Sequence, residues 1–290
     1  MKITAEMHHT AEAAWVDLQR RLWSKLPDSL KPLKPHVYDV AGALVMMMEK
    51  SDALAINRVL GLGLDRPVSE KTLDQIIALY ETAGVKRFCL SLNPGAKPST
   101  ARRKLEARGF DSIGNHIKLF RTIDDEVALN HAVDVRRIGL DNANDFARIV
   151  CKQYGWPEKR IPWLAGMVGV PDFEHFLAFV GAKPIATGML YVKGGVGLLG
   201  WAATETQHRR RGAHAALIAA RIARARELGL RWVTVETTEP ARGRPSGSFR
   251  NLTRCGFVFD APTPYFAWRS TPTPDDGCRT PRAASSHRRA

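Results

Sequence analysis

VGLLGWAATETQHRRRGAH, residues 196–214, is the stretch of this sequence that determines its predicted fold. Residues 196–203 are almost all apolar and predict a strand. Leu217, Ile218, Ile222 and Ala225 then recur at helical spacing, which predicts a helix over 213–228. A basic turn that contains glycine joins the strand to the helix. This order of strand, turn and helix predicts a binding site for a phosphate group.

The turn has three properties that favour a pyrophosphate. The first N–H groups of a helix have no partner within the helix, and the helix dipole adds partial positive charge there. Gly212 lets a ligand approach the backbone closely. Arg209, Arg210 and Arg211 can add charge-assisted hydrogen bonds to the same anion. The sequence contains neither G-x-x-x-x-G-K-[ST] nor G-x-G-x-x-G after a strand, so an ATP-hydrolysing or nicotinamide-binding site is not expected.

Length and composition indicate an ordinary globular protein. The chain has 290 residues, enough for two domains that each bury a core. It is 44% hydrophobic and 25% charged, and no apolar run approaches the roughly 18 residues that a membrane span needs. The first residues lack the features of a signal peptide. We therefore expect a cytoplasmic protein that does not span a membrane.

Cysteine spacing and net charge narrow the choice of partners. Cys89, Cys151, Cys255 and Cys278 are widely scattered, which argues against disulfides and against a zinc site, so no bound metal is expected. The net charge is +14. This favours an anionic partner: nucleic acid, an acidic membrane surface or a phosphorylated cofactor.

The two halves of the sequence repeat one order of elements. A predicted helix ends at Gly84, followed by a strand, a Pro/Gly loop and a helix that ends at Gly109-Phe110. The same order returns between Gly229 and Gly256-Phe257, at an offset of 145 residues. We interpret this as the duplication of a whole domain.

Four segments follow from this repeat. Residues 1–121 form the first domain and residues 133–270 the second. The polar stretch 122–132 is the natural linker, and residues 271–290, rich in Pro, Ser and Arg, are expected to be a disordered tail.

The turn also resembles a known family motif. Residues 209–214 are similar to the acetyl-CoA motif R/Q-x-x-G-x-G/A of the GNAT superfamily (GCN5-related N-acetyltransferases), although His214 stands where Gly or Ala is usual. The order of predicted elements over 133–269 follows the same family. The resemblance implies an α+β fold of three layers: two tandem GNAT-like domains with mixed, mostly antiparallel sheets flanked by helices.

The resemblance further implies where acetyl-CoA binds. In this family the strand before the motif splays from its neighbour, and its backbone groups bind the pantetheine arm. Asn251 resembles an asparagine that contacts the cofactor. The predicted cofactor-binding residues are Trp201, Ala202, Ala203, Thr204, Arg209, Arg210, Arg211, Gly212, Ala213, His214 and Asn251.

Amide formation from acetyl-CoA needs a base for the ammonium and an N–H donor for the oxyanion, and an acid assists the departing thiolate. Glu236 is the first choice for the base, since alternation places it at the carboxyl end of a strand, and Glu205 is the second. Leu252 stands where many family members have a tyrosine acid. Tyr265 or a water could replace that tyrosine, or the thiolate leaves unassisted.

The first domain is predicted to lack the phosphate site. The 145-residue offset places Pro67 opposite Gly212, and proline has no N–H to offer. Asp65 nearby would repel phosphate. The N-terminal half is therefore expected to be structural or to shape the substrate site.

The sequence as a whole predicts an N-acetyltransferase that acts by direct attack of a primary amine of a small molecule or peptide on acetyl-CoA, as a monomer or homodimer. Two alternatives stay open. One is a protein of this fold that binds acyl-CoA without catalysis, and the other, ranked below it, is a nucleic-acid-binding protein.

Overall fold

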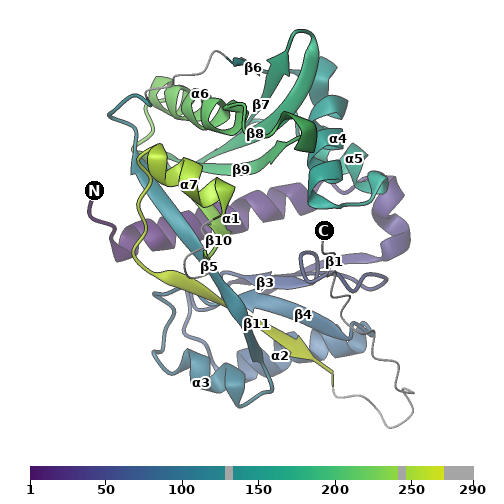
Figure 1. Cartoon of the computed structure of the whole chain (residues 1–290). Helices are drawn as coiled ribbons and strands as arrows, with labels where there is room; N and C mark the ends of the chain where they lie inside the picture. Colours follow the sequence, from purple (N-terminus) through teal and green to yellow (C-terminus); the bar gives the residue numbers. More distant parts are fainter. Residues whose placement is uncertain (128–132, 241–245, 271–290) are drawn as a thin grey trace, which may run out of the picture.

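All strands join one continuous sheet. The computed structural model describes residues 1–127, 133–240 and 246–270. Its 11-stranded sheet has the order β1-β2-β3-β4-β11-β5-β10-β9-β8-β7-β6, with helices on both faces (Figure 1). Most neighbouring strands are antiparallel, and the parallel pairs are β3 with β4 and β9 with β10. The predicted α+β class with a mixed, mostly antiparallel sheet is confirmed, although the two expected sheets are fused into one.

The N-terminal half begins with a long helix and contributes five strands to the sheet. Its elements are α1 (Ala5–Trp23), η1 (Asp28–Leu33), β1 (Pro35–Val40), β2 (Ala43–Met48), β3 (Arg58–Leu60), α2 (Glu70–Thr82), β4 (Arg87–Ser91), α3 (Ala101–Glu106) and β5 (Asp111–Thr122).

The C-terminal half contributes the other six strands. Its elements are β6 (Asp134–Arg137), η2 (Leu140–Asn142), α4 (Ala143–Tyr154), η3 (Glu158–Arg160), α5 (Ile161–Ala165), β7 (Phe173–Val180), β8 (Lys183–Lys193), β9 (Val196–Thr204), η4 (Thr206–His208), α6 (Ala213–Glu227), β10 (Trp232–Thr238), α7 (Gly247–Arg254) and β11 (Pro262–Arg269).

The repeated glycines occupy equivalent places in the two halves. Gly84 and Gly229 follow α2 and α6 with φ of 68° and 65°, and Gly109 and Gly256 follow α3 and α7 with φ of 77° and 80°. A left-handed residue after a helix end is where glycine is strongly favoured. The order α2-β4-α3-β5 in the first half therefore matches α6-β10-α7-β11 in the second.

The two halves exchange their last strands. β5, from the N-terminal half, pairs with β10 of the C-terminal half, and β11 pairs with β4 of the N-terminal half. β5 and β11 also pair with each other at the centre of the sheet (Figure 1). The domain bounds 1–121 and 133–270 stay a prediction about the chain, but in space each half is completed by a strand of the other. Residues 128–132 of the predicted linker and the predicted tail 271–290 lie outside the described residues.

The parallel strands β9 and β10 separate at their carboxyl ends. They pair only over residues 197–199 and 233–235, whereas β9 continues to Thr204 and β10 to Thr238. Trp201 has a φ of 47°, and the register between β8 and β9 shifts between Thr187 and Met189 on the facing strand. A bulge bends its strand locally. The bend turns β9 away from β10 just before the basic turn, as the resemblance implies.

Helix α1 ties the two halves together. Its apolar residues Leu18, Leu22 and Trp23 share one buried cluster with residues of β2, α4, α5, β8 and β9. The indole N–H of Trp163 donates to the carbonyl of Leu22 over 2.7 Å. Figure 1 shows α1 running behind the sheet from the N-terminus toward α4 and α5. The N-terminal half therefore forms part of the surroundings of β9.

No helix in the described part of the chain is both long and apolar enough to cross a membrane. The cysteines among the described residues, Cys89, Cys151 and Cys255, are buried and free. Cys278 lies outside these residues.

Candidate functional site

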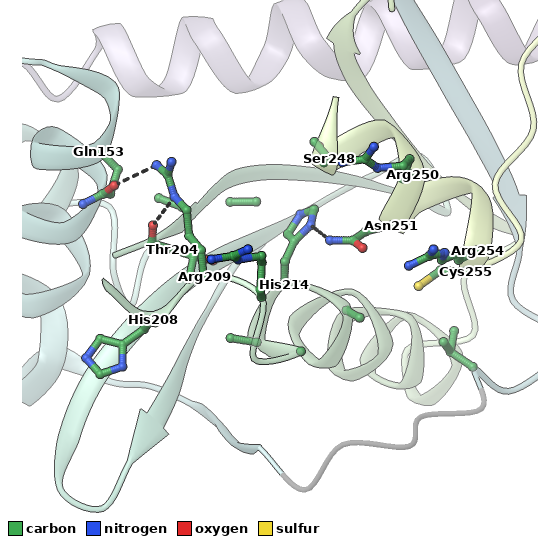
Figure 2. Close-up of a pocket in the computed structure, with 18 of the residues that line it drawn as sticks. Gln153, Thr204, His208, Arg209, His214, Ser248, Arg250, Asn251, Arg254 and Cys255 are labelled. Atoms are coloured by element: carbon green, nitrogen blue, oxygen red, sulfur yellow. Dashed lines mark hydrogen bonds between the residues drawn. The ribbon is translucent and has the colours of Figure 1, made fainter. Parts of the chain in front are cut away.

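A cavity of about 860 Å³ opens where β9 meets the N-terminus of α6. We call it the anion cavity. Figure 2 shows its walls: the end of α4, the end of β9, the turn 208–210, the first residues of α6, and α7. The end of β9, the turn and the start of α6 adjoin one another in the sequence, whereas the end of α4 and α7 come from more distant segments.

The start of α6 leaves N–H groups free for a ligand. Gly212 is the N-cap residue with a φ of 81°, and no side chain of the described residues caps the helix. The Gly212 carbonyl accepts the N–H of Ala216 over 3.0 Å, the first bond of the helix. Residues 212–215 line the anion cavity, so their N–H groups lie at its wall. Arg210 also has a positive φ of 64°, and such turns form concave anion sites.

The corresponding helix of the N-terminal half is closed. Ser69 caps α2, and its hydroxyl accepts the N–H of Thr72 over 3.0 Å. The protein's own side chain thus takes an N–H group that α6 leaves open to a ligand. That the N-terminal half lacks a phosphate site stays a prediction.

Arginines surround the anion cavity. Arg209 donates to Gln153 Oε1 over 3.2 Å and to the Thr204 carbonyl over 3.4 Å, which holds it along the cavity wall (Figure 2). Arg210, Arg250 and Arg254 also line the cavity. None of its described lining residues is an Asp or Glu. A cofactor with a diphosphate and a further phosphate fits such a donor set, because arginine side chains and helix N–H groups both donate to phosphate oxygens.

The structure gathers most of the predicted cofactor residues at this cavity. Those that line it are Ala202, Ala203, Thr204, Arg209, Arg210, Gly212, Ala213, His214 and Asn251. Arg211 is exposed and lies outside the lining. Trp201 lines a neighbouring cavity instead, and its side chain is buried against Phe146, Phe173 and His175. Their role in cofactor binding stays a prediction.

His214, the departure from the family motif, is held in one orientation. Its Nδ1 lies 3.0 Å from the amide nitrogen Nδ2 of Asn251, which can only donate (Figure 2). Nδ1 is therefore the acceptor, and the proton of the neutral ring sits on Nε2. Burial lowers the pKa of His214 to about 4. At neutral pH His214 is thus an uncharged hydrogen-bond donor.

A second cavity of about 450 Å³ adjoins the first, and we call it the tryptophan cavity. It shares Tyr154, Ala202, His214 and Ser248 with the anion cavity. It extends between the separated ends of β9 and β10, so residues 234–238 of β10 line it together with 198–202 of β9. Its indole side chains come from Trp15, Trp23, Trp156, Trp163 and Trp201.

Glu236 lies in the tryptophan cavity within a network of buried polar groups. Its Oε2 lies 2.8 Å from Lys118 Nζ, and its Oε1 lies 3.1 Å from His116 Nδ1. The Tyr265 hydroxyl donates to the same Oε1 over 2.9 Å. Burial alone would raise the pKa of Glu236, but Lys118 and His116 outweigh it and hold the pKa well below its ordinary value. A carboxylate with so low a pKa is a weak base.

Lys118 joins this network to helix α1. Its Nζ lies 2.9 Å from Glu12 Oε2 as well as beside Glu236, and its side chain is 3% exposed. Burial alone would lower the pKa of Lys118, but the two carboxylates raise it well above its ordinary value. Lys118 is therefore a charged structural link between α1, β5 and β10.

The other two predicted catalytic residues lie away from the cavities. Glu205 contacts Lys152, Lys183 and Gln207, and neither cavity includes it. Tyr265 also lines neither cavity. Burial and the adjacent Glu236 raise the pKa of Tyr265 well above its ordinary value, and its proton is directed at Glu236. This geometry makes Tyr265 a partner of Glu236 and leaves its proton unavailable to a thiolate.

Sequence reasoning missed His116, which the exchanged strand β5 places in the C-terminal half's cavity. Its Nδ1 faces Glu236, and the ring lies 4.3 Å from that of Tyr265, centroid to centroid. A carboxylate at Nδ1 fixes the tautomer that leaves the Nε2 lone pair free. Arg250, Arg254 and Gln153 were also missed at the anion cavity. The basic residues within 247–254 could have indicated the arginines of the anion cavity. No feature of the sequence indicated His116, because its position depends on the register between β5 and β10.

Comparisons with solved structures show which known proteins have a similar fold. A GCN5-related N-acetyltransferase from Kribbella flavida is 17% identical, with 89% of this chain and 95% of that chain covered and a TM-score of 0.62. One from Sphaerobacter thermophilus is 14% identical, with 79% and 81% covered and a TM-score of 0.57. A tandem GNAT protein from the clavulanic acid biosynthesis pathway is 12% identical, with 93% and 98% covered and a TM-score of 0.55.

These likenesses confirm the resemblance at the level of the fold: the chain has the tandem fold of GCN5-related N-acetyltransferases. At such low identities they carry nothing further about substrate or mechanism. No protein-family model matches the sequence. No curated protein matches it either.

Proposed function

We propose that this chain, which has the tandem GNAT fold, transfers an acetyl group from acetyl-CoA to a primary amine. One observation carries the proposal: the anion cavity, at the uncapped start of α6, adjoins the tryptophan cavity. The tryptophan cavity lies between the separated ends of β9 and β10 and contains the His116–Glu236 pair. The first suits the phosphates of acetyl-CoA, and the second suits an amine that must lose a proton.

Binding of acetyl-CoA would use the residues of the anion cavity. The N–H groups of 212–215 and the side chains of Arg209 and Arg210 would hold the diphosphate, and Arg250 and Arg254 on α7 would bind a further phosphate. Residues 202–204 of β9, no longer paired with β10, offer backbone groups to the pantetheine arm. The convergence of these arginines on one recessed site favours a compact polyanion over nucleic acid.

His116 is our proposed base in place of Glu236. Glu236 carries a negative charge at neutral pH and would stabilise the incoming ammonium, and its contact with Nδ1 orients the His116 ring. Nε2 of His116 would accept the ammonium proton. As the nitrogen–carbon bond forms and the carbon–sulfur bond breaks, the nitrogen loses its second proton through water to the departing thiolate, and His116 returns the first proton to solvent.

His214 is our proposed donor to the carbonyl oxygen of the acetyl group. It lines both cavities, and its Nε2–H is the ring's one donor once Nδ1 accepts from Asn251. A neutral imidazole is too weak an acid to protonate a thiolate, but it can stabilise a developing oxyanion. This gives a function to the residue that departs from the family motif.

Thiol release from acetyl-CoA in the presence of a panel of amines, with mass spectrometry of the acetylated product, tests the proposal. We expect release that requires both substrates. His116→Gln should lower kcat by about 10²–10⁴-fold without changing the Kd for acetyl-CoA, since the base acts in the chemical step alone.

His36→Gln is the matched control, because His36 forms a similar pair with Glu49 over 2.9 Å on the far strand β1. It should leave kcat unchanged. Saturable binding of acetyl-CoA without thiol release for any amine would overturn the transferase and favour the alternative of a non-catalytic acyl-CoA-binding protein. The absence of a tyrosine at Leu252 is the observation that keeps this alternative in view.

A further inference from the structure

The tryptophan cavity holds a buried arginine without an acceptor. Arg160, at the end of η3, is 5% exposed and lines this cavity. Among residues 1–127, 133–240 and 246–270, no atom accepts a hydrogen bond from its buried Nε, and no carboxylate pairs with its guanidinium. Its Cζ lies 5.3 Å from the centroid of the Trp156 ring. The indole fixes the position of the guanidinium but does not neutralise it.

Two further donors of the same cavity are also without an acceptor. Nε of Arg58 and Nε1 of Trp15 are buried and make no hydrogen bond to the described residues. Arg58 uses one other nitrogen, Nη2, to donate to the Tyr265 hydroxyl over 3.2 Å. The cavity thus presents unmatched N–H groups on aromatic walls. Such groups are costly to bury unless a ligand supplies their acceptors.

An anion that pairs with Arg160 would come from the acceptor substrate. The proposed phosphate sites for acetyl-CoA lie in the anion cavity, which has arginines and helix N–H groups of its own. Arg160 lines the tryptophan cavity and does not line the anion cavity. An amine that enters there must therefore bring its own negative charge if it is to pair with Arg160.

A carboxylate matches the guanidinium of Arg160. The planar guanidinium of Arg160 matches a carboxylate with two parallel hydrogen bonds. Glu236, in the same cavity, carries the charge opposite to that of an ammonium. The two charged side chains match the two charges of an amino acid, and the tryptophan walls suit an apolar side chain.

We propose that the acceptor is a free amino acid with an apolar or aromatic side chain, whose carboxylate pairs with Arg160 while its amino group faces Glu236 and His116. The proposal rests on the transferase function and names its substrate class. Arg160 would act in substrate selection, with no part in proton transfer.

Matched substrates separate the carboxylate from the rest of the molecule. We would measure kcat/KM for phenylalanine against phenethylamine, and for leucine against isopentylamine, with O-phosphoethanolamine as the phosphate-bearing amine. In the wild type we expect each amino acid to exceed its decarboxylated analogue by about 10²-fold, the worth of a charge-assisted pair. Arg160→Gln should remove that preference, leaving the two analogues within about threefold of their wild-type values, with the Kd for acetyl-CoA unchanged.

Arg103→Gln is the control, because Arg103 is exposed on α3 in the N-terminal half. Folding of the Arg160→Gln variant is checked by its Tm. Removal of a buried charge that has no partner should leave Tm equal or higher. A Tm lowered by more than the loss of the Trp156 contact accounts for would mean that Arg160 is paired within the protein, which would overturn the proposal.

A second measurement does not depend on turnover. Calorimetric titration of phenylalanine into the wild type and the Arg160→Gln variant, each with desulfo-CoA present, should show binding that the substitution weakens by about 10²-fold. Equal binding by the two proteins, equal kcat/KM for phenylalanine and phenethylamine, or a preference for O-phosphoethanolamine would each overturn the amino-acid proposal. Binding of phenylalanine with no thiol release would instead contradict the transferase function and leave the site intact.

Discussion

The buried contact of Lys118 with two carboxylates makes a sharp prediction about stability. Its Nζ lies 2.9 Å from Glu12 and 2.8 Å from Glu236, and these side chains are 1% and 16% exposed. In Lys118→Met both carboxylates lose their cation. Glu236 keeps His116 and Tyr265, whereas Glu12 keeps one backbone donor, the N–H of Gly61, at 3.3 Å. The cost of a broken buried pair is about 3–5 kcal/mol, a large part of the stability of a domain.

The double variant Lys118→Met/Glu12→Gln localises this cost. It removes the carboxylate that has the fewest other partners, so we expect it to recover about 2 kcal/mol of the loss. Urea unfolding followed by tryptophan fluorescence at pH 7 measures both values.

The effect should also depend on pH. The pKa of Glu236 is depressed in the folded state, so its charged contacts stabilise the protein above its unfolded pKa, about 4.3, and this contribution is lost as pH falls toward the folded pKa. The difference between wild type and Lys118→Met should therefore shrink below about pH 4. A cost under about 1 kcal/mol at pH 7, or a difference that grows on acidification, would refute the reasoning.

Three further predictions test other parts of the account. His175 is 1% exposed, and neither ring nitrogen has a partner among the described residues. Burial lowers the pKa of His175 to about 4, so the folded state binds fewer protons than the unfolded chain below about pH 6.5. His175→Phe should consequently reduce the stability lost between about pH 6.5 and pH 4, and an unchanged acid limb in urea unfolding would contradict this. Because Ser69 caps α2, calorimetry should find about one acetyl-CoA per chain, and two equivalent sites would argue against a silent N-terminal half. Arg254→Gln should weaken the binding of acetyl-CoA more than the binding of dephospho-CoA, because Arg254 is proposed to bind the phosphate beyond the diphosphate. Equal weakening of the two would mean that Arg254 does not contact that phosphate.

Local patterns predicted the part of the anion cavity whose residues are close together in the sequence. The strand, the basic turn and the start of α6 lie within residues 196–214, and the repeated glycines marked the ends of helices in both halves. Backbone geometry at a helix N-terminus follows from short-range rules, so Gly212 could be assigned without tertiary information. In the N-terminal half the repeat pointed to Pro67 and Asp65, whereas Ser69 is the residue that caps α2.

The contents of the tryptophan cavity could not be predicted, because they depend on pairing between distant strands. Lys118 faces Glu236 because β5 and β10 are neighbours in a register that the exchange of strands creates. Glu236 looked like a base from its place at a strand end, and its pKa falls because of charges that the sequence does not place beside it. Nothing in the sequence indicated Arg160, because its distinguishing property is a buried Nε without a hydrogen-bond acceptor, which depends on the folded structure.

Acetyl-CoA affinity in two variants of Gly212 tests the central claim most directly. Gly212 has a φ of 81°, a conformation that Asn and Asp tolerate better than other residues, so Gly212→Asn and Gly212→Asp share the same strain and differ in charge. Two unit charges about 5 Å apart repel by roughly 3 kcal/mol at an effective dielectric constant of about 20, and solvent in the open cavity reduces this to about 2 kcal/mol. Calorimetric titration should thus show Gly212→Asp binding acetyl-CoA about 30-fold more weakly than Gly212→Asn, a ratio that falls as salt is added. Equal affinity of the two variants would mean that no phosphate lies against the start of α6.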